Sequence, residues 1–283
     1  MPSGIVAAEW TDRPGTVDDL LMDAADRKFP ATVRMIRDWV SLGLLDHPER
    51  RGRGAAHGSD KAVWPWTQRN LFRLLIDKRP QVKGVMPLCN IPVAIWLWWG
   101  EPYVRTAQAQ RVLATWAGKV GSISWPTARE RARELADFLD DLDASRYQRE
   151  RLIDALAKTA RARRIHQDLH DALHEVFDPA GEGRSYGSTR FPLTEEHLLE
   201  LIEYRIKGLE RAAGPAPLDE LERARLLYRD GIRSYAAERK QLLATPIRPQ
   251  DNTMWDEPTW EHLVNHACYH VSVTLGGFVR HGT

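Results

Sequence analysis

Six of the ten histidines form two groups with the same helical spacing. The first group is His166, His170 and His174, and the second is His262, His266 and His270. On a helix, positions i and i+4 lie about 6 Å apart on one face and can bind one metal ion, whereas i and i+8 lie about 12 Å apart and cannot. One hypothesis is therefore a divalent-metal site that takes His266 and His270 from one helix and His170 from another. The other hypothesis is that these histidines are structural and bond to solvent or carboxylates.

Five of the eleven tryptophans lie between residues 91 and 125. Indole rings are the best cation–π faces, so Trp96 and Trp99 are candidates for an aromatic ligand pocket. Clustered tryptophans also form cores and subunit interfaces, and the sequence leaves both interpretations open.

The basic residues are concentrated near the N-terminus. From Arg27 to Lys83 there are 13 Lys and Arg against 5 Asp and Glu, a local charge of +8. The whole chain has a net charge of +1, so the remainder carries −7. A compact basic segment on an otherwise acidic protein is typical of proteins that bind the phosphate backbone of nucleic acids.

Helix signals surround these arginines. Thr16 begins a helix whose capping box is completed by Asp19, and Thr32 begins a second helix that ends at Gly43. Residues 46–61 form a polar, arginine- and glycine-rich loop, 63–66 resemble one strand of a small hairpin, and Thr67 caps a third helix. The expected order is helix, turn, helix, basic loop, strand, helix.

The rest of the chain is expected to be helical. Helical patterns cover 126–177, with further helices at 194–212, 218–243 and 259–279. Residues 178–192 are expected to form a loop or boundary, and no strand is expected after residue 85.

The stretch from Arg34 to Leu45, R-M-I-R-D-W-V-S-L-G-L-L, resembles the MerR-family segment R-T-L-R-Y-Y-E-R-I-G-L-L. The two arginines, the aromatic residue at Trp39 and the Gly-Leu-Leu end fall in register, although Asp38 stands in place of an aromatic. Residues 66–71, W-T-Q-R-N-L, resemble the family's Y-S-x-x-D-L. The resemblance covers about residues 16–80.

This resemblance implies a winged helix-turn-helix that binds double-stranded DNA, with the second helix in the major groove and the wing along the backbone. Arginine forks suit phosphate oxygens and guanine edges. The resemblance also implies pairing of two copies over two half-sites, hence a homodimer. The candidate DNA-binding residues are Thr32, Arg34, Arg37, Trp39, Arg50, Arg51, Arg53, Lys61 and Trp66.

A second, shorter resemblance lies near the C-terminus. Residues 265–270, N-H-A-C-Y-H, are similar to the N-H-x-x-Y-H motif in the last helix of DinB/YfiT-type four-helix bundles. That resemblance implies that His266 and His270 are metal ligands.

Composition and motifs exclude several classes. The longest apolar run, residues 91–99, is shorter than the roughly 20 residues of a membrane helix, and no leader pattern opens the sequence. Cys89 and Cys268 are too few for a disulfide framework. The chain contains no GxGxxG, phosphate-loop, GxSxG or HExxH motif. We therefore expect a cytoplasmic protein without a membrane partner. No motif indicates catalysis, so we do not expect an enzyme, and for the C-terminal half the question stays open.

Together these patterns predict a mainly α protein, with a winged helix-turn-helix followed by a helical-bundle C-terminal region. The expected parts are a tail at 1–15, the DNA-binding domain at 16–85, a Trp-rich helical connection at 86–125 and a helical domain at 126–283 for dimerisation, a protein partner or a small-molecule effector. The predicted function is sequence-specific DNA binding in transcriptional regulation. The alternatives are a metal-dependent helical-bundle enzyme or metal sensor in the C-terminal half, and a plasmid or phage DNA-processing factor.

Overall fold

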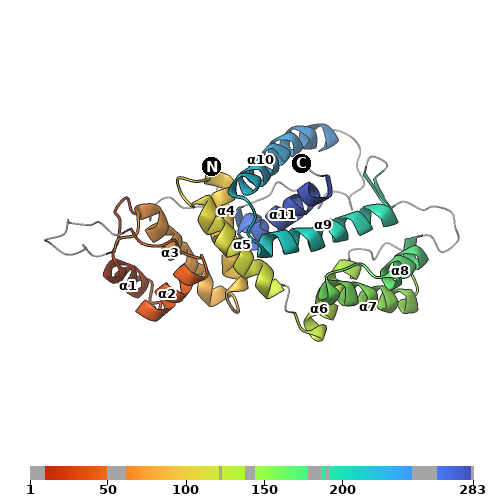
Figure 1. Ribbon diagram of the computed structural model, residues 1–283, viewed down its shortest axis with the longest axis horizontal. Helices are drawn as coiled ribbons and strands as arrows, with labels where there is room; N and C mark the ends of the chain where they lie inside the picture. Colours follow the sequence, from red (N-terminus) through yellow and green to blue (C-terminus); the bar gives the residue numbers. More distant parts are fainter. Residues whose placement is uncertain are drawn as a thin grey trace. The chain divides into compact units, whose positions relative to one another are not determined.

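The computed structural model describes residues 10–49, 62–120, 123–137, 144–177, 186–188, 191–243 and 260–281. Within these ranges the chain is mainly helical, as expected (Figure 1). Contacts group it into two compact units. Unit 1 comprises Met1–Trp116, Ala212–Tyr235 and Glu257–Val271, and unit 2 comprises Ala117–Arg211, Ala236–Asp256 and Ser272–Thr283. Since both units are assembled from separate stretches of chain, the boundaries at residues 85 and 125 stay predictions.

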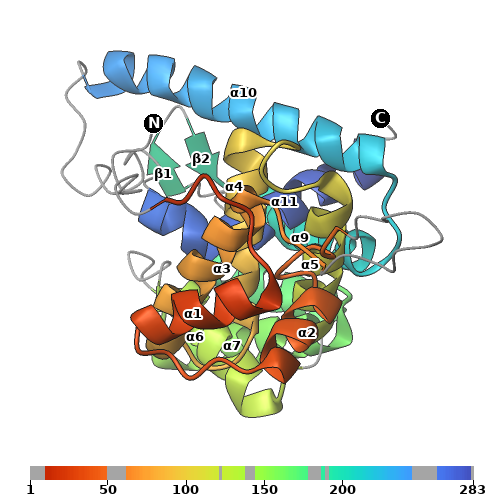
Figure 2. The ribbon, with the colours of Figure 1, turned by 90° about the vertical axis from the view of Figure 1, so that its left-hand side faces the viewer.

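Unit 1 begins with three short helices, α1 (Val17–Asp26), α2 (Val33–Ser41) and α3 (Trp66–Lys78). They lie together in Figure 2, where α1 and α2 are red and α3 is orange. Their shared core is apolar and fully buried, and it contains Leu20, Ile36, Trp39, Leu71, Phe72 and Leu75. Burial of this stripe on each helix stabilises three elements that are individually too short to persist in water.

The first two helix starts are confirmed. The backbone N–H of Thr16 donates to Asp19 Oδ2 at 2.7 Å, and the N–H of Asp19 donates to Thr16 Oγ1 at 3.4 Å, which completes the capping box. The N–H of Met35 donates to Thr32 Oγ1 at 3.2 Å at the start of α2. In each case the hydroxyl satisfies a backbone donor that has no partner within the helix.

Two predictions around residue 65 are wrong. Helix α3 begins at Trp66 with Pro65 as its N-cap, and not after Thr67. The predicted strand at 63–66 is replaced by two isolated antiparallel pairs, Val63 with Glu49 and Trp64 with Gly15. Proline has no N–H to continue a ladder, and its φ is already helical, so it both ends the pairing and admits the helix.

The remaining helices of unit 1 surround an apolar centre. Short 3-10 turns at Arg79–Gln81 and Met86–Cys89 lead into α4 (Asn90–Trp99), which is buried along most of its length. Helix α5 (Thr106–Val120) belongs to this unit as far as residue 116, α10 (Leu218–Leu243) as far as 235, and α11 (Trp260–His281) as far as 271. An apolar helix with no polar face requires neighbours on all sides, which explains why α4 lies in the core.

Unit 2 is built around α6 (Trp125–Asp137), α7 (Arg146–Ala162), α8 (Gln167–Phe177) and α9 (Glu195–Ala213) as far as residue 211. Leucines that the helical pattern places inside are buried in its core, namely Leu152, Leu156, Leu169 and Leu173. None of the helices in the described ranges has the length and apolar composition needed to cross a membrane.

Unit 2 also contains a small hairpin that the sequence did not predict. Strand β1 (Tyr186–Ser188) pairs antiparallel with β2 (Phe191–Leu193), and Ser188 lies opposite Phe191. The expectation of no strand after residue 85 is therefore wrong, and residues 186–188 and 191–192 of the expected loop or boundary form strands. Residues 178–185 and 189–190 lie outside the described residues. Strands of three residues, one of them containing Pro192, are too short to show the alternating pattern by which strands are recognised.

Candidate nucleic-acid interface

Helix α2 has two chemically different faces. Ile36 and Trp39 are 1% and 3% exposed, and the Trp39 ring packs on Phe72 with 5.8 Å between ring centroids. Arg34 and Arg37 are exposed on the rest of the helix, one turn apart. The helix is therefore anchored by its apolar side and presents two guanidinium groups to solvent.

Three other described arginines in or next to the first three helices are neutralised by carboxylates. On α3, Arg69 and Arg73 both bind Asp23, at 2.6 Å and 2.5 Å, and Arg27 binds Asp77 at 3.2 Å. The local positive charge that the sequence suggests is thus partly neutralised by Asp23 of α1 and Asp77 of α3.

By contrast, neither Arg34 nor Arg37 has a carboxylate partner among the described residues. Asp38 is exposed one turn after Arg34 on the same helix, yet the two form no ion pair in the described structure. An unpaired, exposed arginine keeps all its donors available for a planar anionic ligand such as phosphate.

Asp23 fixes α1 against α3. Asp23 is 2% exposed, and its carboxylate receives two hydrogen bonds from Arg69, at 2.6 and 3.0 Å, and one from Arg73 at 2.5 Å. Burial acts to raise the pKa of Asp23, but the hydrogen bonds from the two arginines outweigh it and hold the pKa below its ordinary value. Asp23 is therefore ionised at neutral pH and acts as the counterion of two arginines.

Polar side chains of α5 fix the C-terminal end of α2. Gln108 Nε2 donates to the carbonyls of Gly43 and Leu44 at 3.2 and 3.4 Å, and Thr115 Oγ1 donates to the carbonyl of Leu42 at 3.0 Å. These carbonyls follow the last turn of α2, where the helix itself offers no donors. Side chains of α5 supply the missing hydrogen-bond donors.

Gly43 is required at this contact. Its φ is +79°, and a Cβ there would lie 2.9 Å from both Arg111 Cβ and Val112 N. A side chain would thus be strained by its own backbone and would clash with α5. The predicted helix end at Gly43 is confirmed, and the reason is tertiary as well as local.

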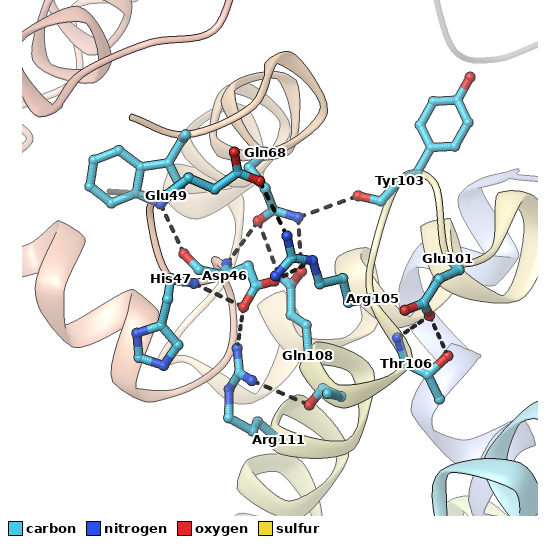
Figure 3. A network of polar contacts seen from close by, with 12 residues as sticks. Asp46, His47, Glu49, Gln68, Glu101, Tyr103, Arg105, Thr106, Gln108 and Arg111 are labelled. Carbon is cyan, nitrogen blue, oxygen red and sulfur yellow. Dashed lines mark hydrogen bonds and ion pairs between the residues drawn. The ribbon is translucent and has the colours of Figure 1, made fainter. Parts of the chain in front are cut away.

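The loop after α2 is held by Asp46. Its N–H donates to Gln68 Oε1 at 2.8 Å, its carbonyl accepts from Trp64 Nε1 at 2.9 Å, and its carboxylate accepts from Arg111 at 2.7 Å. Gln68 in turn donates to Gln108 at 2.8 Å (Figure 3). These polar positions were not predicted, because a buried glutamine in a helix carries no local signal in the sequence.

The predicted DNA-binding residues differ in their surroundings. Thr32 is exposed, but its hydroxyl is engaged as the N-cap of α2. The prediction that Trp39 contacts DNA is wrong, because this residue is buried in the core and offers no surface to a ligand. Four further candidates, Arg50, Arg51, Arg53 and Lys61, lie outside the described residues.

Trp66, 37% exposed, belongs to an aromatic cluster of unit 1. Its ring lies 5.6 Å from Tyr103 and 6.4 Å from Trp10. The ring of Trp99 lies 5.6 Å from both Tyr103 and Trp260. The tryptophans therefore pack mainly on one another.

The proposed pairing of Trp96 with Trp99 in a ligand pocket needs correction. Trp96 is fully buried, and its indole N–H donates to Thr106 Oγ1 at 3.1 Å. A ring in the core with its only donor satisfied has no face left for a ligand. Trp99 remains half-buried in the aromatic cluster.

The predicted set of three histidines divides between the units. His170 belongs to unit 2, whereas His266 and His270 belong to unit 1. In the described parts of the chain, no group of three or more histidine, cysteine, aspartate or glutamate side chains is arranged to hold a metal.

Two histidine side chains at positions i and i+8 come much closer than the about 12 Å between their positions along the helix axis suggests. His262 Nε2 and His270 Nε2 lie 3.1 Å apart. Burial, and then the neighbouring His262 and His266, lower the pKa of His270 to about 4. His262 was not among the predicted metal ligands.

Comparisons with models of protein families, with curated proteins and with solved structures return no significant match for this chain.

Proposed function

We propose that unit 1 binds double-stranded DNA through α2, with this helix in the major groove. The observation that carries the proposal is the pair of exposed arginines, Arg34 and Arg37, which have no carboxylate partner in the described structure and stand on a helix anchored on its opposite face. Arginine at the surface of a groove-binding helix contacts phosphate oxygens or guanine edges.

The anchoring of α2 supports the same function. A helix that binds in a DNA groove must keep its orientation within narrow limits. This requires side-chain packing and supporting hydrogen bonds that hold the helix in place. Here Trp39 and Phe72 hold its apolar side, and Gln108 and Thr115 hold its final carbonyls.

Residues 50–61 provide the second half of the proposed interface. The residues on either side of this segment, Glu49 and Val63, exchange backbone hydrogen bonds at 2.8 and 2.9 Å, which brings the two ends of the segment together. In a MerR-like winged helix-turn-helix this is the position of the wing. We propose that Arg50, Arg51, Arg53 and Lys61 contact phosphates there.

The biological role that fits this interface is transcriptional regulation by a homodimer. A single recognition helix covers too few base pairs for a specific site, so two copies over two half-sites are expected. The helical remainder would then supply the dimer contacts and the response to an effector or partner protein.

The direct test is the salt dependence of DNA binding. For duplex DNA, each phosphate that the protein neutralises contributes about 0.9 to the slope of log K against log salt concentration. We expect Arg34→Ala and Arg37→Ala each to weaken binding to random duplexes by fluorescence anisotropy. A variant whose arginine binds a phosphate in the wild-type complex should have a slope smaller by about one.

The matched control is Arg133→Ala, which removes an exposed arginine of unit 2. This variant should bind DNA with the wild-type affinity and slope. If all three variants behave alike, or if the wild-type chain does not bind duplex DNA at all, the proposal is wrong. Selection from random duplexes with the wild-type chain then identifies the preferred sequence.

A further inference from the structure

Three histidines of α11 cluster in unit 1. The ring centroids of His262 and His266 are 4.7 Å apart, those of His262 and His270 are 5.3 Å apart, and those of His266 and His270 are 6.5 Å apart. His262 and His266 are exposed and His270 is half-buried, so the cluster is open to solvent. The feature that singles out one pair is the 3.1 Å between the Nε2 atoms of His262 and His270.

This separation suits two ligands of one metal ion. With metal–nitrogen bonds of about 2.0–2.1 Å, two nitrogens 3.1 Å apart subtend an angle of about 100° at the ion. That angle lies between the octahedral and the tetrahedral values. Both histidines present Nε2, the ring nitrogen farther from the backbone.

The ring of His270 is held in place by a neighbouring helix. Tyr228 of α10 packs on His270 with 5.2 Å between ring centroids, and the ring of Tyr269 lies 5.7 Å from it on another side. A ligand whose ring is fixed before the metal arrives loses less conformational freedom on binding. His262, at the more exposed end, completes the pair.

We propose that His262 and His270 form a binding site for a divalent late transition-metal ion, coordinated through both Nε2 atoms. Two protein ligands leave the other coordination positions to water or to a small donor molecule. Imidazole suits copper, nickel and zinc, whereas magnesium and calcium prefer oxygen ligands. Affinity should therefore be greatest for Cu²⁺, lower for Ni²⁺ and Zn²⁺, and negligible for Mg²⁺.

A distance of 3.1 Å also fits a hydrogen bond from one neutral imidazole to the other. The experiment must therefore distinguish a metal site from a hydrogen-bonded pair of histidines. Full-length, tag-free protein is titrated with Cu²⁺ or Ni²⁺ alone by calorimetry. The proposal predicts one ion per chain. The Cu²⁺ complex should show nitrogen hyperfine coupling from two imidazoles by electron paramagnetic resonance.

The variants use the second histidine group as a control. His262→Ala and His270→Gln should each weaken binding by more than the about 10–100-fold typical of losing an outer-shell partner. His170→Ala removes a histidine with the same sequence spacing on α8 and should change nothing. The melting temperature of each metal-free variant reports whether it folds.

Three results would overturn the proposal. The first is that the wild-type chain takes up no Cu²⁺, Ni²⁺ or Zn²⁺, which would show that the two histidines are only hydrogen-bonded to each other. His266→Ala and His270→Gln abolish binding while His262→Ala does not, which would identify the i, i+4 pair as the site. His170→Ala weakens binding as much as His262→Ala, which would indicate nonspecific uptake by exposed histidines. None of these results bears on DNA binding by α2.

Discussion

Asp23 is the residue whose replacement should most clearly weaken the three-helix module that carries α2. Its side chain is 3% exposed, and its partners Arg69 and Arg73 are 13% and 17% exposed. Asp23→Asn keeps the shape of the side chain but removes the charge. Arg69 and Arg73, both mostly buried, then lose the carboxylate that they share.

The expected cost follows from that burial. Removing one partner of a buried ion pair typically destabilises a protein by about 3–5 kcal/mol. Since both guanidinium groups keep some contact with solvent and asparagine can still accept a hydrogen bond, we expect about 3 kcal/mol. The matched control is Asp77→Asn, because the Asp77 side chain is 52% exposed and its pair with Arg27 should be worth at most about 1 kcal/mol.

Hydrogen exchange of the amides in α1–α3, measured with urea unfolding, localises the loss to this module. The effect should also depend on pH. The pKa of Asp23 is lowered in the folded state, so the stability from its charge is present above the unfolded value of about 3.9 and is lost as the pH falls through the folded value. The difference between wild type and Asp23→Asn should thus be constant near neutrality and shrink in acid.

Two outcomes would refute this reasoning. One is an Asp23→Asn variant that loses no more protection in α1–α3 than Asp77→Asn. The other is a difference from wild type that grows as the pH is lowered below 4, because a protonated Asp23 should resemble asparagine.

Three further predictions concern packing and assembly. Gly276→Ala should destabilise unit 2 by about 1–3 kcal/mol or more in urea unfolding, since a Cβ there would lie 1.9 Å from the carbonyl oxygen of Tyr204. Gly277→Ala, whose Cβ would meet nothing within 4 Å, should be neutral or slightly stabilising, and equal effects of the two changes would contradict the close helix contact. Trp39→Phe should lower the melting temperature without changing the salt slope of DNA binding, whereas a reduced slope would return this residue to the interface. Light scattering should give the mass of a homodimer, and a monomer both with and without DNA would rule out pairing over two half-sites.

The features that depend on neighbouring residues could be predicted from local sequence signals. The starts of α1 and α2 follow from Thr16, Asp19 and Thr32, since a helix cap involves only residues within one turn. The end of α2 at Gly43 and the bounds of α10 were predicted for the same reason, because glycine conformation and helical periodicity are local properties. The mainly helical class follows from such signals added along the chain.

The roles of several candidate site residues depend on contacts between distant parts of the chain and emerge only in the folded structure. Trp39 and Trp96 were candidate binding residues because of their aromatic rings. In the folded chain, neighbouring side chains bury both rings. The role of Gln108 depends on carbonyls 64 and 65 residues away in the chain, which no local pattern can specify. Among the arginines, the structure separates those bound to Asp23 from Arg34 and Arg37, which have no carboxylate partner among the described residues. Charge and burial depend on distances between residues remote in sequence, and only folding fixes those distances.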